Sequence, residues 1–227
     1  MRPVVRFYTH IAIVFAFNTA LLAALSWAYY SPRFARHRIS DKPGIKVPWP
    51  ARLRTMATIS TLSLLVVLGG TYVAFPWLVS TDHAPWWRIA LEATSILVIY
   101  DFAYYFLHRT LHHKKLMRFV HGVHHRARNP SALESFYLHP IELVLGLGLL
   151  LASTLVIGPV DSLSFLIAFF AYSNLNIIIH AGLDLPGRLL APTSFLTRKH
   201  HVHHQNDFNK NFSSLTPLPD LIFRTAG

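Results

Sequence analysis

The chain has 227 residues, of which 52% are hydrophobic and only 14% charged, whereas a typical soluble domain carries about 25% charged residues. This composition predicts an integral membrane protein. The absence of cysteine excludes disulfides, iron–sulfur clusters, thiolate metal sites and a cysteine nucleophile, so imidazole, carboxylate or water must hold any metal. The net charge of +11 favours a membrane surface and no nucleic acid partner, because the basic residues are spread over several loops that flank apolar segments.

Five apolar segments follow one another along the chain, at about 11–30, 57–79, 89–107, 141–157 and 163–179. A membrane-spanning helix needs roughly 17–25 predominantly apolar residues, so all five qualify, the last two marginally. The last two are joined by the short turn Gly158–Asp161, and the sequence allows this hairpin either to span the membrane or to re-enter it. The first segment is longer than the roughly 7–15 apolar residues of a signal peptide and lacks a clear cleavage site, so we expect a retained anchor.

The distribution of basic residues supports five spans. Eighteen of the 21 Lys and Arg residues fall in three stretches, 31–56, 108–140 and the tail after His180. An odd number of spans places these three stretches on the same face of the membrane. The positive-inside rule predicts that this face is cytosolic.

Histidines are concentrated in the same basic stretches, and twelve of the fifteen lie between His108 and His204. One group has the spacing HxxxH and two have the spacing HxxHH. On a helix, residues three and four apart share a face, so HxxxH should direct two imidazoles to one point and HxxHH three. Imidazole binds Fe, Zn, Cu and Ni, so the ligand type alone does not name the metal. The three groups contain His108 and His112; His121, His124 and His125; and His200, His203 and His204.

Eight imidazoles are enough for two metal ions with open coordination positions. Metal-buffering histidine loops are the competing interpretation, but such loops are usually low-complexity tracts, whereas these groups lie in helix-compatible sequence. A histidine-rich membrane metal transporter is a further alternative from a different class. Transport would require polar residues deep within the spans, which are nearly all apolar. The main exceptions are Asn18, Glu92, Asn174 and Asn176.

Five stretches of sequence resemble the fatty acid hydroxylase / sterol desaturase superfamily: DFAYYFLHRTLHH, HGVHH, FYLHPIE, HAGLDLP and HHVHHQNDFNKNF. The resemblance covers about residues 101–225. It implies an all-α, polytopic membrane enzyme with a histidine-bound di-iron centre on the cytosolic face. Such an enzyme uses O2 and two electrons to hydroxylate, demethylate or desaturate a lipid C–H position. The tail departs from the family pattern, with Pro219 in place of a usual Trp and Arg224 in place of a usual Gly.

The resemblance also implies which side chains bind metal, and it leaves two residues open. His139 matches a family histidine that either binds metal or orients a ligand. Some relatives carry a histidine at a spacing comparable to that of Asp184, so whether Asp184 binds metal is open. The implied metal ligands are His108, His112, His121, His124, His125, His180, His200, His203 and His204.

A ligand imidazole is commonly oriented by a group that accepts a hydrogen bond from its other ring nitrogen. Asp101 is our candidate for this role because it lies two helical turns before His108. Its alternative role is a carboxylate at the end of a span, paired with an arginine. Glu134 and Glu142 are further candidates for orienting an imidazole.

These observations predict residues 1–100 as an N-terminal transmembrane region, in which three spans begin, and residues 101–227 as a catalytic region with a further transmembrane hairpin. We expect a lipid substrate of fatty acyl, sterol or isoprenoid type, hydroxylated or, alternatively, desaturated. No fused haem domain or dinucleotide fingerprint is apparent, so the electrons must come from a separate reductase or electron-transfer protein. We favour a bacterial inner membrane over the endoplasmic reticulum.

Overall fold

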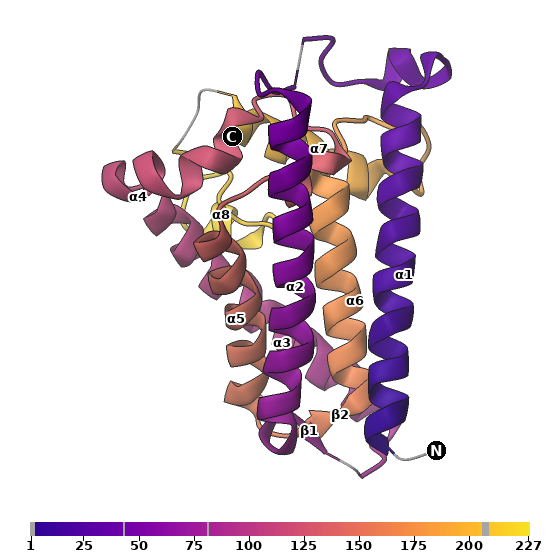
Figure 1. The fold of residues 1–227 in the computed structure, drawn as a ribbon. Helices are drawn as coiled ribbons and strands as arrows, with labels where there is room; N and C mark the ends of the chain where they lie inside the picture. Colours follow the sequence, from indigo (N-terminus) through magenta and orange to yellow (C-terminus); the bar gives the residue numbers. More distant parts are fainter. Residues whose placement is uncertain (1–2, 43, 81, 206–208) are drawn as a thin grey trace.

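The computed structural model describes residues 3–42, 44–80, 82–205 and 209–227 (Figure 1). Within these residues, five helices are long and apolar enough to cross a membrane, which fits an integral multi-pass protein. The prediction of a polytopic all-α fold is confirmed, apart from two very short strands. The five long helices are α1 (Pro3–Tyr30), α2 (Trp49–Leu78), α3 (Trp86–Leu111), α5 (Pro140–Ile157) and α6 (Ser162–Ile179).

The long helices form a bundle in which α1 packs against α6, α2 against α5, and α3 against both α5 and α6. Large apolar side chains such as Leu65, Tyr72 and Val73 remain exposed on its outside, as expected for helices surrounded by lipid. α2 begins at Trp49 rather than near Ala57, so its first two turns are more polar than the predicted span. The prolines around Trp49 favour this start, because a proline in the first helical turn costs no hydrogen bond.

One end of the bundle is closed by β1 (Val79–Ser80), which pairs in parallel with β2 (Val160–Asp161). The buried carboxylate of Glu92 accepts hydrogen bonds from the Asp161 amide and the Ser164 hydroxyl. These contacts hold the α5–α6 turn at the level of the α2–α3 connection. The α5–α6 hairpin therefore traverses the whole bundle, which favours a spanning hairpin over a re-entrant one. Strands of two residues are too short to leave an alternating pattern in the sequence.

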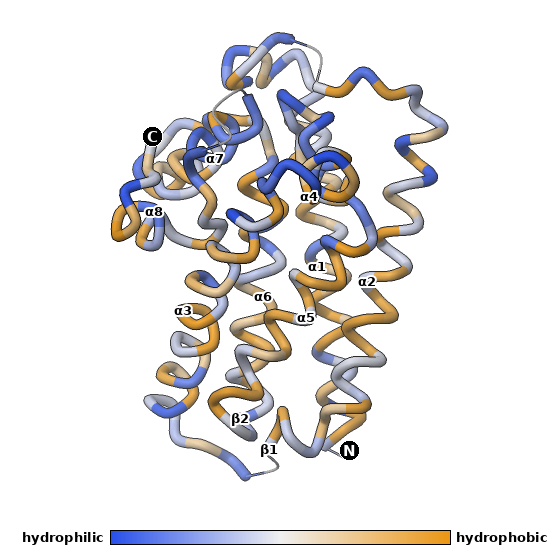
Figure 2. The backbone as a smooth tube through the Cα atoms, turned by 90° about the vertical axis from the view of Figure 1, so that its left-hand side faces the viewer, coloured by the Kyte–Doolittle hydropathy of each residue, from blue (hydrophilic) through white to orange (hydrophobic). Residues whose placement is uncertain are grey.

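The opposite end, which we call the histidine end, comprises the described residues of 31–48, 112–139 and 180–227. It is the upper end in Figure 1, and Figure 2 shows that it is hydrophilic where the bundle below is apolar. All three basic stretches meet there, as the predicted topology requires. Its short elements are η1 (Pro32–His37), α4 (Lys114–Phe119), η2 (His121–Arg126), η3 (Ala132–Phe136), α7 (Ala191–His204) and α8 (Leu218–Ile222).

Candidate metal centre

Nine histidines meet at the histidine end in two adjacent groups. Within each group, one ring nitrogen from every histidine lies within 4.8 Å of the others. All nine are the histidines predicted as metal ligands, and all but His112 are buried. The five-histidine group contains His108, His112, His121, His125 and His203. The four-histidine group contains His124, His180, His200 and His204.

The two HxxHH motifs do not each direct three imidazoles to one point, so the expectation from helical spacing is corrected here. His124 belongs to the four-histidine group, whereas its neighbours in the motif join the five-histidine group. His203 belongs to the five-histidine group, whereas its neighbours join the other. The physical reason is that the side chains of consecutive helical residues point about 100° apart around the axis. A motif that lies between two sites therefore contributes imidazoles to both. Each motif therefore ties the two groups into one unit.

Backbone carbonyls fix which ring nitrogen carries the proton in several of these histidines. A carbonyl only accepts hydrogen bonds, so a ring nitrogen beside it must carry the proton, which leaves a lone pair on Nε2. Among contacts between described residues, four of the nine histidines have such a contact, at donor–acceptor distances of 2.6 to 3.3 Å. The Nδ1 donors and carbonyl acceptors are His108 with Phe212, His124 with Tyr137, His180 with Asn176, and His203 with Lys210.

These lone pairs point at one another, and this observation tests whether the residues fit a metal. The Nε2 atoms of His108 and His203, both protonated on Nδ1, are 3.1 Å apart, and those of His124 and His180 are also 3.1 Å apart. No hydrogen bond can form between two unprotonated nitrogens. Two nitrogens bound at right angles to one metal, with bonds of about 2.1 Å, would lie about 3.0 Å apart. The donor sets of both groups therefore fit a metal ion.

Burial keeps these imidazoles neutral, which is the form that binds metal. Desolvation lowers the pKa of His121 from 6.5 to about 3. Burial, together with the neighbouring His124, lowers the pKa of His180 to about 3 as well. The pKa of His200 is lowered in the same direction by burial and by the adjacent histidines. Both groups therefore contain neutral imidazole at physiological pH.

The three candidate carboxylates have different surroundings. Glu142 lies 2.9 Å from His121 Nδ1, although the pair is bent away from hydrogen-bond geometry. Asp101 accepts hydrogen bonds from the Leu215 and Thr216 backbone and from the Thr216 hydroxyl, so it contacts the C-terminal segment. Glu134 forms an ion pair with Arg52 and caps η3 through Ser131. Of the three, Glu142 is the one placed to orient an imidazole.

The remaining candidates lie outside both groups. His139 is the N-cap of α5, where its Nδ1 accepts from the Ile141 amide. Asp184 is nearly half exposed and forms an ion pair with Arg198. His201 is buried on another side of α7, with its Nε2 3.0 Å from the Gln205 amide nitrogen. The separation of His201 from the other histidines of its motif agrees with the helical spacing.

A buried network behind the five-histidine group was not predicted. Asp220, which is fully buried, accepts hydrogen bonds from the Phe212 and Ser213 amides and forms an ion pair with Lys199. Lys199 Nζ also donates to the Ser213 carbonyl. Because the Phe212 carbonyl accepts from His108, this network positions a ring of the site. Its signal in the sequence was one aspartate in the apolar stretch LPDLIF, together with a lysine directly before a histidine motif.

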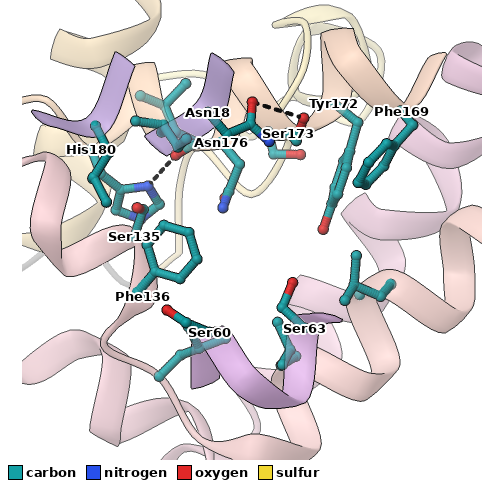
Figure 3. A pocket seen from close by; sticks show the side chains of 18 of the residues that line it. Asn18, Ser60, Ser63, Ser135, Phe136, Phe169, Tyr172, Ser173, Asn176 and His180 are labelled. Carbon is teal, nitrogen blue, oxygen red and sulfur yellow. Dashed lines mark hydrogen bonds between the residues drawn. The ribbon is translucent and has the colours of Figure 1, made fainter. Parts of the chain in front are cut away.

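A cavity of about 440 Å³ extends from the four-histidine group into the bundle between α1, α2, α5 and α6 (Figure 3). His124, His180 and His200 line it at one end. Within the described residues, no member of the five-histidine group lines it. The site therefore joins a polar histidine cluster to a cavity inside the apolar part of the protein.

The protein-family model for fatty acid hydroxylase matches residues 93–225, which is more than half of the chain. The chain belongs to the fatty acid hydroxylase family. The resemblance seen in the sequence is thereby confirmed, and the matched region contains all nine histidines. No solved structure matches this family member.

The curated relatives include methylsterol monooxygenases and very-long-chain aldehyde decarbonylases. This family member is 33% identical over 172 residues to methylsterol monooxygenase 1 of Rattus norvegicus, covering 71% of this chain and 56% of the relative. It is 31% identical over 173 residues to a very-long-chain aldehyde decarbonylase of Oryza sativa subsp. indica, covering 71% of this chain and 62% of the relative. The chain thus spans less than two thirds of the length of these relatives.

Proposed function

We propose that the protein is a membrane-bound, di-iron, O2-dependent oxidoreductase that hydroxylates a C–H position of a lipid. The observation that carries this proposal is the cavity, which starts among membrane-spanning helices and ends at His124, His180 and His200. A lipid in this cavity would lie directly against one of two metal-binding groups. Family membership supports the same reaction class, and so does the name of the methylsterol monooxygenase relatives.

Each part of the site has a role in this proposal. The nine imidazoles would hold two iron ions, and backbone carbonyls fix the protonation of four of the rings. Bound iron would supply the oxidising power for an unactivated C–H bond, which amino-acid side chains lack. Glu142 orients His121. The surrounding helices exclude bulk water and align the lipid chain with the four-histidine group.

The membrane orientation and the approach of the electron donor are inferred from the distribution of basic residues. We propose that the histidine end faces the cytosol, because eighteen of the 21 Lys and Arg residues lie in this end or in the adjoining turns of α2 and α3, and we favour a bacterial inner membrane. The electrons come from a separate reductase or electron-transfer protein that approaches this basic end. Residues 101–227 supply every histidine of the site, and residues 1–100 supply the α1 and α2 walls of the cavity.

A desaturase of the same family would use the same site, since both reactions begin at a C–H bond of a bound lipid. Expression with host electron donors, followed by mass spectrometry of extracted lipids, separates the two. Hydroxylation adds one oxygen to a lipid, whereas desaturation removes two hydrogens. The variant His124→Ala should produce neither change. Retained activity in His124→Ala, or purified active protein with only trace metal, would overturn the proposal.

A further inference from the structure

Beside its histidine-lined end, the cavity wall carries hydrogen-bonding side chains that are uncharged. Figure 3 shows them pointing into the cavity from three helices. Helices that face lipid rarely place so many polar groups together, because lipid tails offer no hydrogen-bond partners. This polar set comprises Asn18 of α1, Ser60 and Ser63 of α2, and Ser173 and Asn176 of α6.

Most of the polar set has no partner within the described residues. The side chains of Ser60, Ser63 and Asn176 form no hydrogen bond there. Asn18 Oδ1 has one long contact, 3.4 Å from the Ser173 hydroxyl. By contrast, Thr71 in α2 donates to the carbonyl one turn earlier at 2.6 Å, the usual arrangement for a hydroxyl in a membrane helix. A polar group without a partner in an apolar setting costs free energy, so a bound molecule should supply the partners.

The polar set lies close to the four-histidine group. Asn176 is one helical turn before His180, about 5.4 Å along the axis, and its carbonyl accepts from that ring at 2.7 Å. Ser173 lies one turn further into the bundle. A ligand group bound by these side chains would therefore be held a few carbon atoms from the C–H bond that meets the histidines.

The described cavity lining provides no counter-ion for an anionic headgroup. Its described lining contains no lysine or arginine, and its one carboxylate, Glu142, lies against His121. A phosphate or carboxylate in this setting would be desolvated without a counter-ion. Serine hydroxyls and asparagine amides both donate and accept, which matches an alcohol group, since a hydroxyl does the same.

The cavity is accessible from the side of the bundle. α1 and α2 touch at the end far from the histidines, where the Phe7 and Phe75 rings are 5.4 Å apart. Nearer the histidines, Thr19 of α1 and Ser60 and Leu64 of α2 line the cavity and are also exposed. An opening between α1 and α2 at this height faces lipid tails, so an uncharged lipid can enter from within the membrane.

We propose that the cavity binds an uncharged lipid alcohol, and that Asn18, Ser60, Ser63 and Asn176 bind its hydroxyl group. The hydroxyl lies a few carbons from the oxidised position. This inference rests on the proposed function, because it names the class of lipid that the same site would oxidise. It excludes plain hydrocarbons and charged lipids as preferred ligands.

Binding without turnover tests the inference. The iron-loaded, full-length protein is placed in phosphatidylcholine nanodiscs under oxygen-free conditions. It is then offered three lipid alcohols beside their parent hydrocarbons: cholesterol and cholestane, geranylgeraniol and its deoxy hydrocarbon, and hexadecanol and hexadecane. Retained lipid is measured by mass spectrometry against protein-free nanodiscs. We expect at least one alcohol to be retained at least ten-fold above its hydrocarbon.

Variants of the polar set assign this selectivity to named side chains. Asn18→Leu and Ser63→Ala should each weaken retention of the selected alcohol by about 2- to 10-fold, the loss expected for one hydrogen bond. The control Thr61→Ala removes a hydroxyl from the same helix that is exposed and does not line the cavity, so it should change nothing.

Equal retention of alcohol and hydrocarbon overturns the inference. So does retention of no alcohol above the protein-free level, which would mean that water fills the polar end. Unchanged binding in both cavity variants also overturns it. Alcohol selectivity in a protein that oxidises no lipid contradicts the proposed function alone, whereas oxidation of a lipid without alcohol preference contradicts this inference alone.

Discussion

The two histidine groups differ in what lies behind them and in front of them. The five-histidine group is supported by the C-terminal segment, through the Phe212 and Lys210 carbonyls, and lies away from the cavity. The four-histidine group is supported by α6 and by the loop carbonyl of Tyr137, and it faces the cavity. The group with fewer imidazoles is thus the one next to the cavity. Catalytic metal sites keep a coordination position open, so under the proposed function this difference indicates where the chemistry occurs.

Removing one histidine from each group should reveal the largest difference between the two groups. His200→Ala leaves three imidazoles in the four-histidine group, whereas His112→Ala leaves four in the other. We expect His200→Ala to lose about one metal ion per chain and all activity, and His112→Ala to retain more of its metal. Metal content per chain, measured by elemental mass spectrometry, tests this. The neighbouring His201→Ala is the control, and equal losses in the first two variants would contradict the asymmetry.

The C-terminal support of the five-histidine group should be sensitive to Asp220. Asp220→Asn leaves the buried ammonium of Lys199 without its counter-ion, which typically costs about 3–5 kcal/mol of stability. The free energy of unfolding in mixed micelles, followed by circular dichroism, measures this. The control Asp184→Asn breaks an exposed pair with Arg198 and should cost under about 1 kcal/mol. Similar values for the two variants would show that Asp220 does not anchor this segment.

Glu142 gives the five-histidine group a carboxylate contact that no described residue gives the other. Glu142→Gln keeps the shape but removes the charge beside His121, and loss of such a partner typically lowers metal affinity or activity by about 10–100-fold. Metal titration of the apo-protein measures the affinity. Glu134→Gln, which alters the pair with Arg52, should leave metal affinity unchanged. An unaltered affinity in Glu142→Gln would remove Glu142 from the site.

Acidification is the test in which the two groups should behave alike. His121 and His180, one from each group, have a pKa near 3 in the fold and 6.5 when unfolded. Below pH 6.5 the unfolded chain binds protons that the folded chain does not, so stability falls as the pH is lowered from about 6.5 to 3. Each histidine contributes a slope of about 1.4 kcal/mol per pH unit. Unfolding of the apo-protein between pH 8 and 4 should show a plateau above pH 7 and then a decline; a flat profile would contradict burial.

Much of the architecture was available from local sequence alone. A span is recognised by a continuous apolar run, and the placement of basic residues fixes which loops share a face, because both depend on single segments in a bilayer. The nine clustered histidines were predicted for similar reasons, since spacing and flanking residues mark them without knowledge of distant contacts. His139, which matched a family histidine that binds metal or orients a ligand, caps α5 in the structure.

The tertiary structure decided what depends on residues far apart in the chain. The division of each HxxHH motif between two groups follows from how η2 and α7 approach α3, which no spacing rule contains. Asp101 meets its hydrogen-bond partners Leu215 and Thr216, which lie far along the chain, only because the C-terminal segment folds back. The polar set of the cavity exists only where α1, α2 and α6 meet. The sequence by itself determined the five apolar helices and the nine clustered histidines, because these are encoded segment by segment, while packing between segments decided the geometry of the site and the cavity beside it.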